Sequence, residues 1–188
     1  MLRCSLPLLV SPFLLTACAT ASEEAGPAAP AVQSARAVLL APDGSPRGQA
    51  TAVAAGDGIR LTIEGEALPP GSHGAHVHMT GACVAPDFAS AGGHWNPTGR
   101  QHGKNNPQGM HMGDLPNLLI GTDGRGTLEI TVPGATLTGG SNPLLDADGS
   151  AMVIHAGPDD MVTDPSGNSG VHSFPTRRSS DLDRKSVV

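Results

Sequence analysis

Residues 48–67 read GQATAVAAGDGIRLTIEGEA, two strand-like segments on either side of a Gly-Asp-Gly turn. In residues 59–67 apolar and polar side chains alternate with a period of two, the pattern of a strand with one buried face. The glycines of the turn mark a break in the chain direction. The stretch therefore predicts two β-strands joined by a turn.

The same kind of pattern extends to both sides of this stretch. Further strand-like runs cover residues 35–41, 118–122, 126–132 and 150–155. No segment sustains a helical period, and two long loops are predicted, at about residues 81–116 and 157–170. A chain of 188 residues has room for one domain of this kind. The prediction is an all-β, antiparallel sandwich or barrel.

The composition limits both the possible folds and the possible partners. The chain has 25 Gly and 17 Pro but only one Trp and no Tyr, which disfavours a helical bundle and fits strands joined by turn-rich loops. Its formal net charge of −6 argues against nucleic acid as a partner. An anionic substrate would need a local positive field, such as that of a metal ion.

The N-terminus carries a targeting pattern. Arg3 precedes an apolar run at residues 6–15, which is too short to remain as a membrane-spanning helix. The following Leu15-Thr16-Ala17-Cys18 resembles the cleavage box of bacterial lipoproteins, in which the cysteine becomes a lipidated N-terminus. The expectation is export to the periplasm and a lipid anchor at Cys18 in the bacterial outer membrane.

The alternative to a lipid anchor is an ordinary secretion signal that is cleaved near Ala19 or Ala21. Residues 1–17 are thus expected to be a signal peptide, and the small, Pro-rich residues 18–34 a flexible tether. In both cases the domain lies in an oxidising compartment, and Cys83 is the one cysteine left to it.

Histidines are concentrated in the middle of the chain. Seven of the eight occur at positions 73, 76, 78, 94, 102, 111 and 155. One histidine is most often an ordinary surface or core residue, but this many within a window of 83 residues, 73–155, favours a metal site.

The spacing of these histidines supports that interpretation. His76 and His78 are two residues apart in a predicted strand, so their side chains point to the same face and suit copper or zinc. The loop from His94 to Asp114 holds three histidines and one aspartate, a plausible closed zinc site. His155 ends a strand, and Asp159 is placed to accept hydrogen bonds from ligand histidines.

Four blocks of sequence resemble the copper/zinc superoxide dismutases. They are GSHGAHVHMTGAC, AGGHWNPTGRQHG, MHMGDLPNL and VIHAGPDD, and they occur in the family's order with compatible spacing. The resemblance covers about residues 35–170. It implies a Greek-key, immunoglobulin-like barrel of eight strands, the last of which has no counterpart here.

The resemblance also implies roles for individual residues. The copper ligands would be His76, His78, His94 and His155. The zinc ligands would be His94, His102, His111 and Asp114, with His94 bridging both ions as an imidazolate. Asp159 would hydrogen-bond to one ligand of each metal, and His73 would support a strand without binding metal. Cys83 would form a disulfide with a second cysteine, which is not found among residues 171–188.

The activity implied by the resemblance is conversion of superoxide to oxygen and hydrogen peroxide, which protects the cell envelope. Copper would alternate between Cu(II) and Cu(I), zinc would be structural, and His94 would supply a proton. The substrate partner is thus superoxide, and the membrane is contacted only through Cys18. Both a monomer and a homodimer are compatible with the sequence.

Residues 172–188, HSFPTRRSSDLDRKSVV, depart from the family. They lack a strand pattern, and codons for HSFPTRRSSDL match a common sequencing adapter whose reverse complement continues as DRKSVV. This segment is therefore expected to be an artefact of a truncated record, leaving residues 35–171 as the dismutase domain. A genuine divergent tail is the alternative.

Two other functional classes remain open. One is a non-enzymatic copper- or zinc-binding protein of the cell envelope on the same barrel, which loss of a copper ligand would favour. The other is an adhesion-type β-sandwich with incidental histidines, which would not need Asp114 or Asp159 at these positions.

Overall fold

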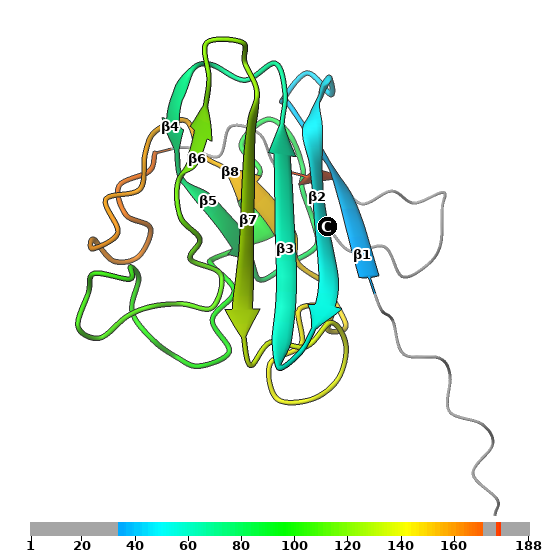
Figure 1. Cartoon of the computed structure of the whole chain (residues 1–188), viewed down its shortest axis with the longest axis vertical. Helices are drawn as coiled ribbons and strands as arrows, with labels where there is room; N and C mark the ends of the chain where they lie inside the picture. The colour runs from blue at the N-terminus through cyan, green and yellow to red at the C-terminus, as the bar shows by residue number, and fades with distance from the viewer. Residues whose placement is uncertain (1–33, 171–175, 178–188) are drawn as a thin grey trace, which may run out of the picture. The chain divides into compact units, whose positions relative to one another are not determined.

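The computed structural model describes residues 34–170 and 176–177 (Figure 1). The strands are β1 (Ser34–Leu40), β2 (Pro46–Ala55), β3 (Gly58–Gly65), β4 (Gly71–His73), β5 (Ala75–His78), β6 (Leu118–Ile120), β7 (Gly126–Pro133), β8 (Ala151–Ile154) and β9 (Thr176–Arg177). The one helical element in the described ranges is a 3-10 turn, η1 (Ala89–Ala91). The predicted all-β, antiparallel class is confirmed.

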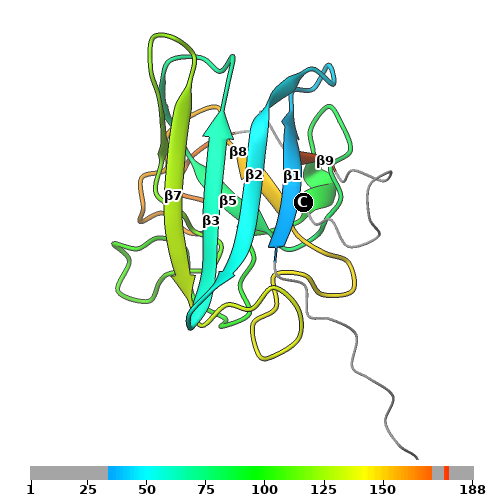
Figure 2. The same cartoon turned by 45° about the vertical axis from the view of Figure 1, so that its right-hand side comes forward.

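One layer is a five-stranded sheet in the order β7-β3-β2-β1-β9. Strands β2 and β3 pair from Gly48 opposite Gly65 to Ala55 opposite Gly58, which is the hairpin predicted by the alternating sequence. After β3 the chain leaves the sheet, forms β4, β5 and β6, and returns as β7, which pairs with β3 (Figure 2).

The second layer consists of two short pairs, β4 with β6 and β5 with β8. Between the layers lies a core of buried side chains that includes Leu39, Ile59, Ile63, Leu118 and Ile154. All four residues of β5 are buried. Ala75 and Val77 face this core, so the alternation of a strand turns His76 and His78 to the other side.

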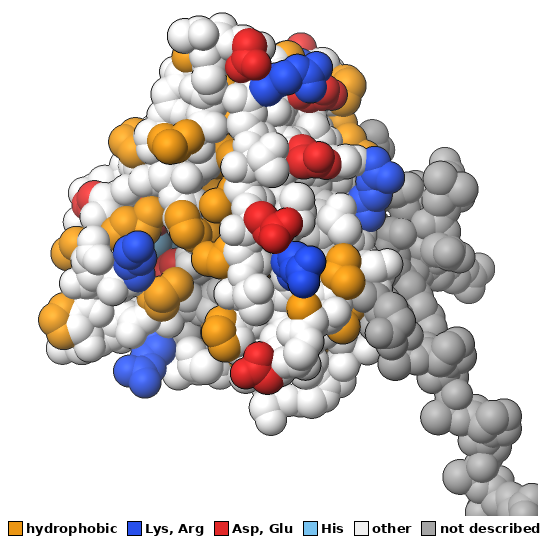
Figure 3. Space-filling view, viewed as in Figure 1, with side chains coloured by type: hydrophobic (Ala, Val, Ile, Leu, Met, Phe, Trp, Pro, Cys, Tyr) orange, Lys and Arg blue, Asp and Glu red, His pale blue; other side chains and the backbone are white. Residues whose placement is uncertain are grey.

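The outer face of the five-stranded sheet is mostly polar, although Val38 and Val53 are also exposed on it. Figure 3 shows acidic and basic side chains interspersed over this face. Across three strands, Arg36 donates to Gln49, and Gln49 donates to Glu64. The sheet therefore buries one face only, as the period of two requires.

Two short strands were not predicted from the sequence. β4 has three residues, too few for an alternating pattern to be recognised. Residues 172–188 show no strand pattern, yet Thr176–Arg177 pair with Val38 and Leu39 of β1 as a two-residue strand. The physical reason is that β1 has an outer edge, and an edge pairs through backbone groups whatever the side chains.

Several predictions fall on residues 1–33, 171–175 and 178–188, outside the described part. These are the signal peptide, the tether, the lipid anchor at Cys18 and most of the adapter-like segment. Among the described residues, no helix is long and apolar enough to cross a membrane.

Candidate metal centre

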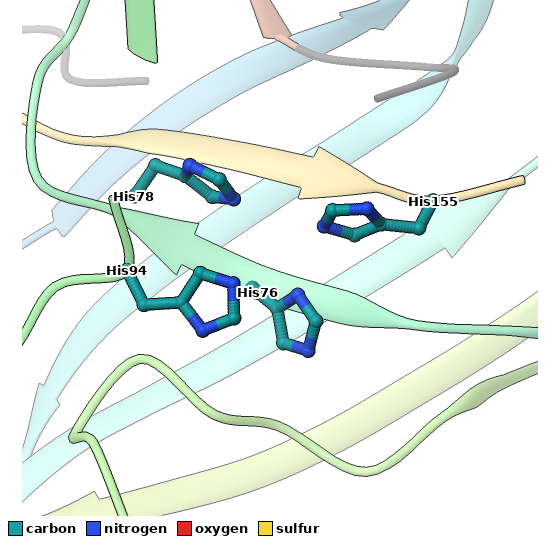
Figure 4. A group of neighbouring side chains, drawn as sticks. All are labelled: His76, His78, His94 and His155. Carbon is teal, nitrogen blue, oxygen red and sulfur yellow. The ribbon is translucent and has the colours of Figure 1, made fainter. Parts of the chain in front are cut away.

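The central strand of the site is β5, with β8 beside it. The register pairs His76 with Val153 and His78 with Ala151, and β8 ends just before His155. The backbone N–H of His155 donates to the carbonyl of Gly74, at 2.8 Å. This bond places the third histidine next to the two of β5, and Figure 4 shows the three imidazoles gathered around a common space with that of His94.

The long loop predicted at residues 81–116 is attached to β5 at two points. The N–H of Trp95 donates to the carbonyl of Val77 (2.8 Å), and the N–H of Val77 donates to the carbonyl of Gly113 (2.9 Å). Trp95 and Leu115 are also buried in the main core. These anchors lie next to His94 and Asp114 in the chain, and so hold both residues against β5.

Gly113 is required for this close approach. A Cβ atom at this position would lie 2.3 Å from the carbonyl oxygen of Val77. Any side chain would therefore push the loop away from β5, together with the neighbouring Asp114.

Four buried histidines form the first donor group. His76, His78, His94 and His155 each offer one nitrogen, and these nitrogens lie within 4.8 Å of one another. In three of the rings the other nitrogen faces an acceptor: Asp159 Oδ2 for His76 Nε2 (2.7 Å), Gly92 O for His78 Nδ1 (2.8 Å) and Gly170 O for His155 Nδ1 (3.1 Å). These acceptors hold the ring protons, so the lone pairs of His76 Nδ1 and of the buried Nε2 atoms of His78 and His155 are available to a metal.

The second donor group surrounds Asp114. Its Oδ1 atom lies 2.8 Å from His94 Nδ1, 3.0 Å from His102 Nδ1 and 3.1 Å from His111 Nδ1. Its Oδ2 atom is fixed by the backbone N–H groups of Gly103 (2.9 Å) and His111 (3.0 Å). In a tetrahedral zinc site with bonds of about 2.0–2.1 Å, neighbouring ligand atoms are about 3.3 Å apart, close to the distances seen here.

His102 gives a direct test of whether a cation fits. Its Nε2 donates to Asp159 Oδ1 at 3.0 Å, which leaves a lone pair on Nδ1 in the neutral ring. That buried Nδ1 lies 3.0 Å from Asp114 Oδ1 but has no hydrogen-bond partner of acceptable geometry. Two lone pairs at this distance repel each other unless a positive charge lies close to both. The residues present thus fit a metal cation.

His94 belongs to both groups. Its Nδ1 contacts Asp114, and its Nε2 is buried without a hydrogen-bond partner. Its ring centroid is 4.0 Å from that of His76 and 5.4 Å from that of His111. One imidazole therefore connects the four-histidine group to the Asp114 group.

A second combination of residues is also close enough to hold an ion. His76, His94, His102 and Asp114 each offer an atom within 4.8 Å of the others. However, His76 Nε2 is bonded to Asp159, and its Nδ1 is shared with the four-histidine group. His111 instead contacts Asp114 directly, at 3.1 Å.

Burial and close neighbours shift the pKa values of the histidines and carboxyl groups at this site. Burial lowers the pKa of His94 to about 4, although its bond to Asp114 works in the opposite direction. Burial also lowers the pKa of His102, but the nearby carboxylates of Asp114 and Asp159 prevail and raise it to about 9. Although burial raises the pKa of both carboxyl groups, their histidine contacts hold them well below the usual range. Both carboxylates are therefore charged, and a metal ion would replace the His102 proton as their counter-charge.

Other predicted residues lie close to this centre. Asp159 joins the two groups, since its carboxylate contacts His76 on one oxygen and His102 on the other. His73 is buried, and its two ring nitrogens face the carbonyls of His155 and Pro69, both at 2.9 Å. Cys83 is partly buried and packs against a small core cluster beside β1 and β8.

Two functional residues were missed in the sequence. Asn117 bonds to the backbone of Asp159, and Gly167 lies against the Asp159 carboxylate. Asn117 stands within the block MHMGDLPNL, three residues after Asp114, but no spacing rule connects it to Asp159. Gly167 belongs to a run of turn residues in which no single glycine is distinctive.

Comparisons with known proteins agree with this geometry. The family model described as copper/zinc superoxide dismutase (SODC) matches residues 46–174. The superoxide dismutase [Cu-Zn] of Caulobacter vibrioides is 46% identical over 140 residues, which cover 73% of this chain and 80% of that protein. This chain belongs to the copper/zinc superoxide dismutase family.

Two further similarities are to proteins of Bacillus subtilis. The superoxide dismutase-like protein YojM is 49% identical over 116 residues, 61% of this chain, and the match spans only 59% of YojM. The crystal structure of a SOD-like protein from the same organism has a TM-score of 0.72 and 42% identity, and covers 75% of this chain and 95% of that one. These similarities support the Greek-key β-sandwich.

Proposed function

We propose that this protein is a superoxide dismutase that holds copper at the four-histidine group and zinc at the Asp114 group. The observation that carries the proposal is His94, whose two nitrogens serve the two groups: Nδ1 lies 2.8 Å from Asp114 Oδ1, and Nε2 is buried on the other side of the ring. An imidazole can bridge two metals only if both nitrogens are available in this way.

The ligand assignment follows from which nitrogen of each ring is available. Copper is assigned to His76 Nδ1, His78 Nε2, His94 Nε2 and His155 Nε2. Zinc is assigned to the Nδ1 atoms of His94, His102 and His111 and to Asp114 Oδ1. A carboxylate in the second set suits zinc, whereas an all-imidazole set suits a redox-active copper ion.

When bound, copper would accept an electron from one superoxide anion and give it to a second, so that two superoxide anions and two protons yield one oxygen molecule and one hydrogen peroxide. The protein contributes control of a proton. His94 Nε2 is the atom proposed to take up and release it. Burial lowers the pKa of His94 to about 4, so the ring is uncharged at neutral pH and can offer a lone pair to a ligand or a proton.

Asp114 and the backbone around it would hold His94 in place. Asp114 Oδ2 accepts two backbone N–H bonds, so the carboxylate cannot turn when the His94 ring gains or loses a proton. A fixed carboxylate keeps the bridging ring in one orientation and thereby keeps Nε2 directed at the four-histidine group.

A non-enzymatic metal-binding protein is the second candidate, because the two donor groups can hold metal ions whether or not the protein turns over superoxide. A turnover assay separates the two. Protein loaded with copper and zinc should consume superoxide in large molar excess, whereas the zinc-only form should not accelerate its decay. If the copper-loaded form consumed no more than about one superoxide per copper, the protein would be a binder and not an enzyme.

We further propose that the protein works in the cell envelope, anchored through Cys18. The support is the LTAC pattern and the apolar run before it. In Cys18→Ser we expect the protein to move from the membrane to the soluble fraction or to stay unprocessed. Metabolic labelling with a palmitate analogue is the measurement, and equal labelling of the two proteins would refute the anchor.

A further inference from the structure

We propose that Asn117 and Gly167 are positioning residues that fix the Asp159 carboxylate between the two metal-binding groups. Asp159 hydrogen-bonds to His76 of the four-histidine group and to His102 of the Asp114 group, and these contacts decide which nitrogen of each ring can bind metal. The inference rests on the metal sites of the proposed function. It concerns how the protein fixes the orientation of the metal-binding histidines.

Asn117 fixes the backbone of Asp159. Its Oδ1 accepts the N–H of Asp159 at 2.8 Å, and its Nδ2 donates to the carbonyl of Asp159 at 2.9 Å. Only an amide offers a donor and an acceptor at this spacing. A carboxylate at position 117 would keep the first bond but turn an oxygen toward the carbonyl of Asp159. Asn117 lies just before β6, so Asp159 is tied to the barrel across 42 residues of sequence.

The two oxygens of Asp159 then have separate partners. Oδ1 accepts the N–H of Met161 at 2.6 Å and contacts His102 Nε2 at 3.0 Å, while Oδ2 contacts His76 Nε2 at 2.7 Å. With the backbone held by Asn117, one carboxylate orientation satisfies all three partners. The protons of both rings are thereby held on Nε2, and both Nδ1 atoms are left to the metals.

Gly167 provides the space that this orientation needs. A Cβ atom at position 167 would lie 1.7 Å from Asp159 Oδ1 and 2.8 Å from His102 Nε2. Gly167 also has a positive φ of 62°. Its N–H donates to Thr163 O (2.6 Å) and its carbonyl accepts from Asp160 (2.9 Å), so the backbone has little freedom to move away. A side chain here must therefore displace the carboxylate.

The two positions can be tested with matched controls. Asn117→Asp is compared with Asn142→Asp, because Asn142 is also partly buried and donates to a backbone carbonyl, that of Gly134, at 3.0 Å. Gly167→Ala is compared with Gly139→Ala, because Gly139 has a φ of 64° but nothing within 4 Å of the added Cβ. Each control thus carries the same chemical change without the contact to Asp159.

The readouts are the zinc dissociation constant, from competition with a chromophoric chelator, and the visible spectrum of Co²⁺ bound in the zinc site. Asn117→Asp and Gly167→Ala should each weaken zinc binding by about 10–100-fold and change the Co²⁺ bands, as expected when an outer partner of a ligand is lost. The two controls should stay within about twofold of the parent protein, because they leave the contacts of Asp159 unchanged.

A purely structural role would give a different result. It would lower the melting temperature of the metal-free protein but leave the zinc affinity and the Co²⁺ spectrum of the folded variant unchanged, and that outcome would overturn the proposal. Should Gly167→Ala not fold, Asn117→Asp, which adds no bulk, carries the test. These readouts use Zn²⁺ or Co²⁺ alone, so they are independent of whether the copper-loaded protein turns over superoxide.

Discussion

His94→Ala should lose activity and disturb both metals at once. The substitution removes one nitrogen from each donor group and leaves Asp114 Oδ1 with two histidine contacts in place of three. It also removes the atom proposed to carry the proton, a role that contributes about 10²–10⁴-fold in enzymes. We therefore expect the rate of superoxide decay per chain to fall by at least about 100-fold.

Metal analysis and Cu²⁺ electron paramagnetic resonance check this expectation. His94→Ala should bind less zinc under conditions in which the parent protein is saturated, and the copper signal should change, because both sites lose a ligand. If the variant retained two ions and an unchanged copper spectrum, His94 would not be the bridge.

His111→Ala should affect the zinc site alone. His111 contacts Asp114 Oδ1 at 3.1 Å and is absent from the four-histidine group. Losing a residue that only hydrogen-bonds to a metal ligand typically weakens metal binding by about 10–100-fold. His111 is a proposed direct ligand, so its loss should weaken zinc binding by more than that. The melting temperature should fall as well, because metal binding contributes free energy to folding.

Copper binding is the internal control for this variant. His111→Ala should still bind one copper through the four histidines, with a copper affinity close to that of the parent protein. Equal loss of copper and zinc would contradict the assignment of His111 to zinc alone. Retention of full zinc affinity would favour the alternative combination that contains His76.

The sequence predicted the elements with a strong local period. The hairpin of β2 and β3 follows from the alternation in residues 59–67, and the common face of His76 and His78 follows from strand geometry alone. The gathering of donors from a strand and two long loops was predicted mainly from the family resemblance, because no local pattern specifies how a loop folds back on a strand.

Other features depend on contacts that the sequence does not display. β4 is too short to show a period, and the pairing of β9 with β1 arises from backbone groups at a sheet edge. Asn117 contacts Asp159 across 42 residues of sequence. Gly167 matters because the Asp159 carboxylate occupies the place that a side chain would need. Such constraints exist only once the fold has formed.

Titration of copper into zinc-loaded protein, followed by stopped-flow measurement of superoxide decay, tests the central claim most directly. The four-histidine group offers one set of nitrogens per chain. The catalytic rate should therefore rise in proportion to added copper and stop rising at one copper per chain. A rate that does not rise with copper, or that keeps rising beyond one equivalent as free copper does, would contradict the assignment of this group as the catalytic copper site.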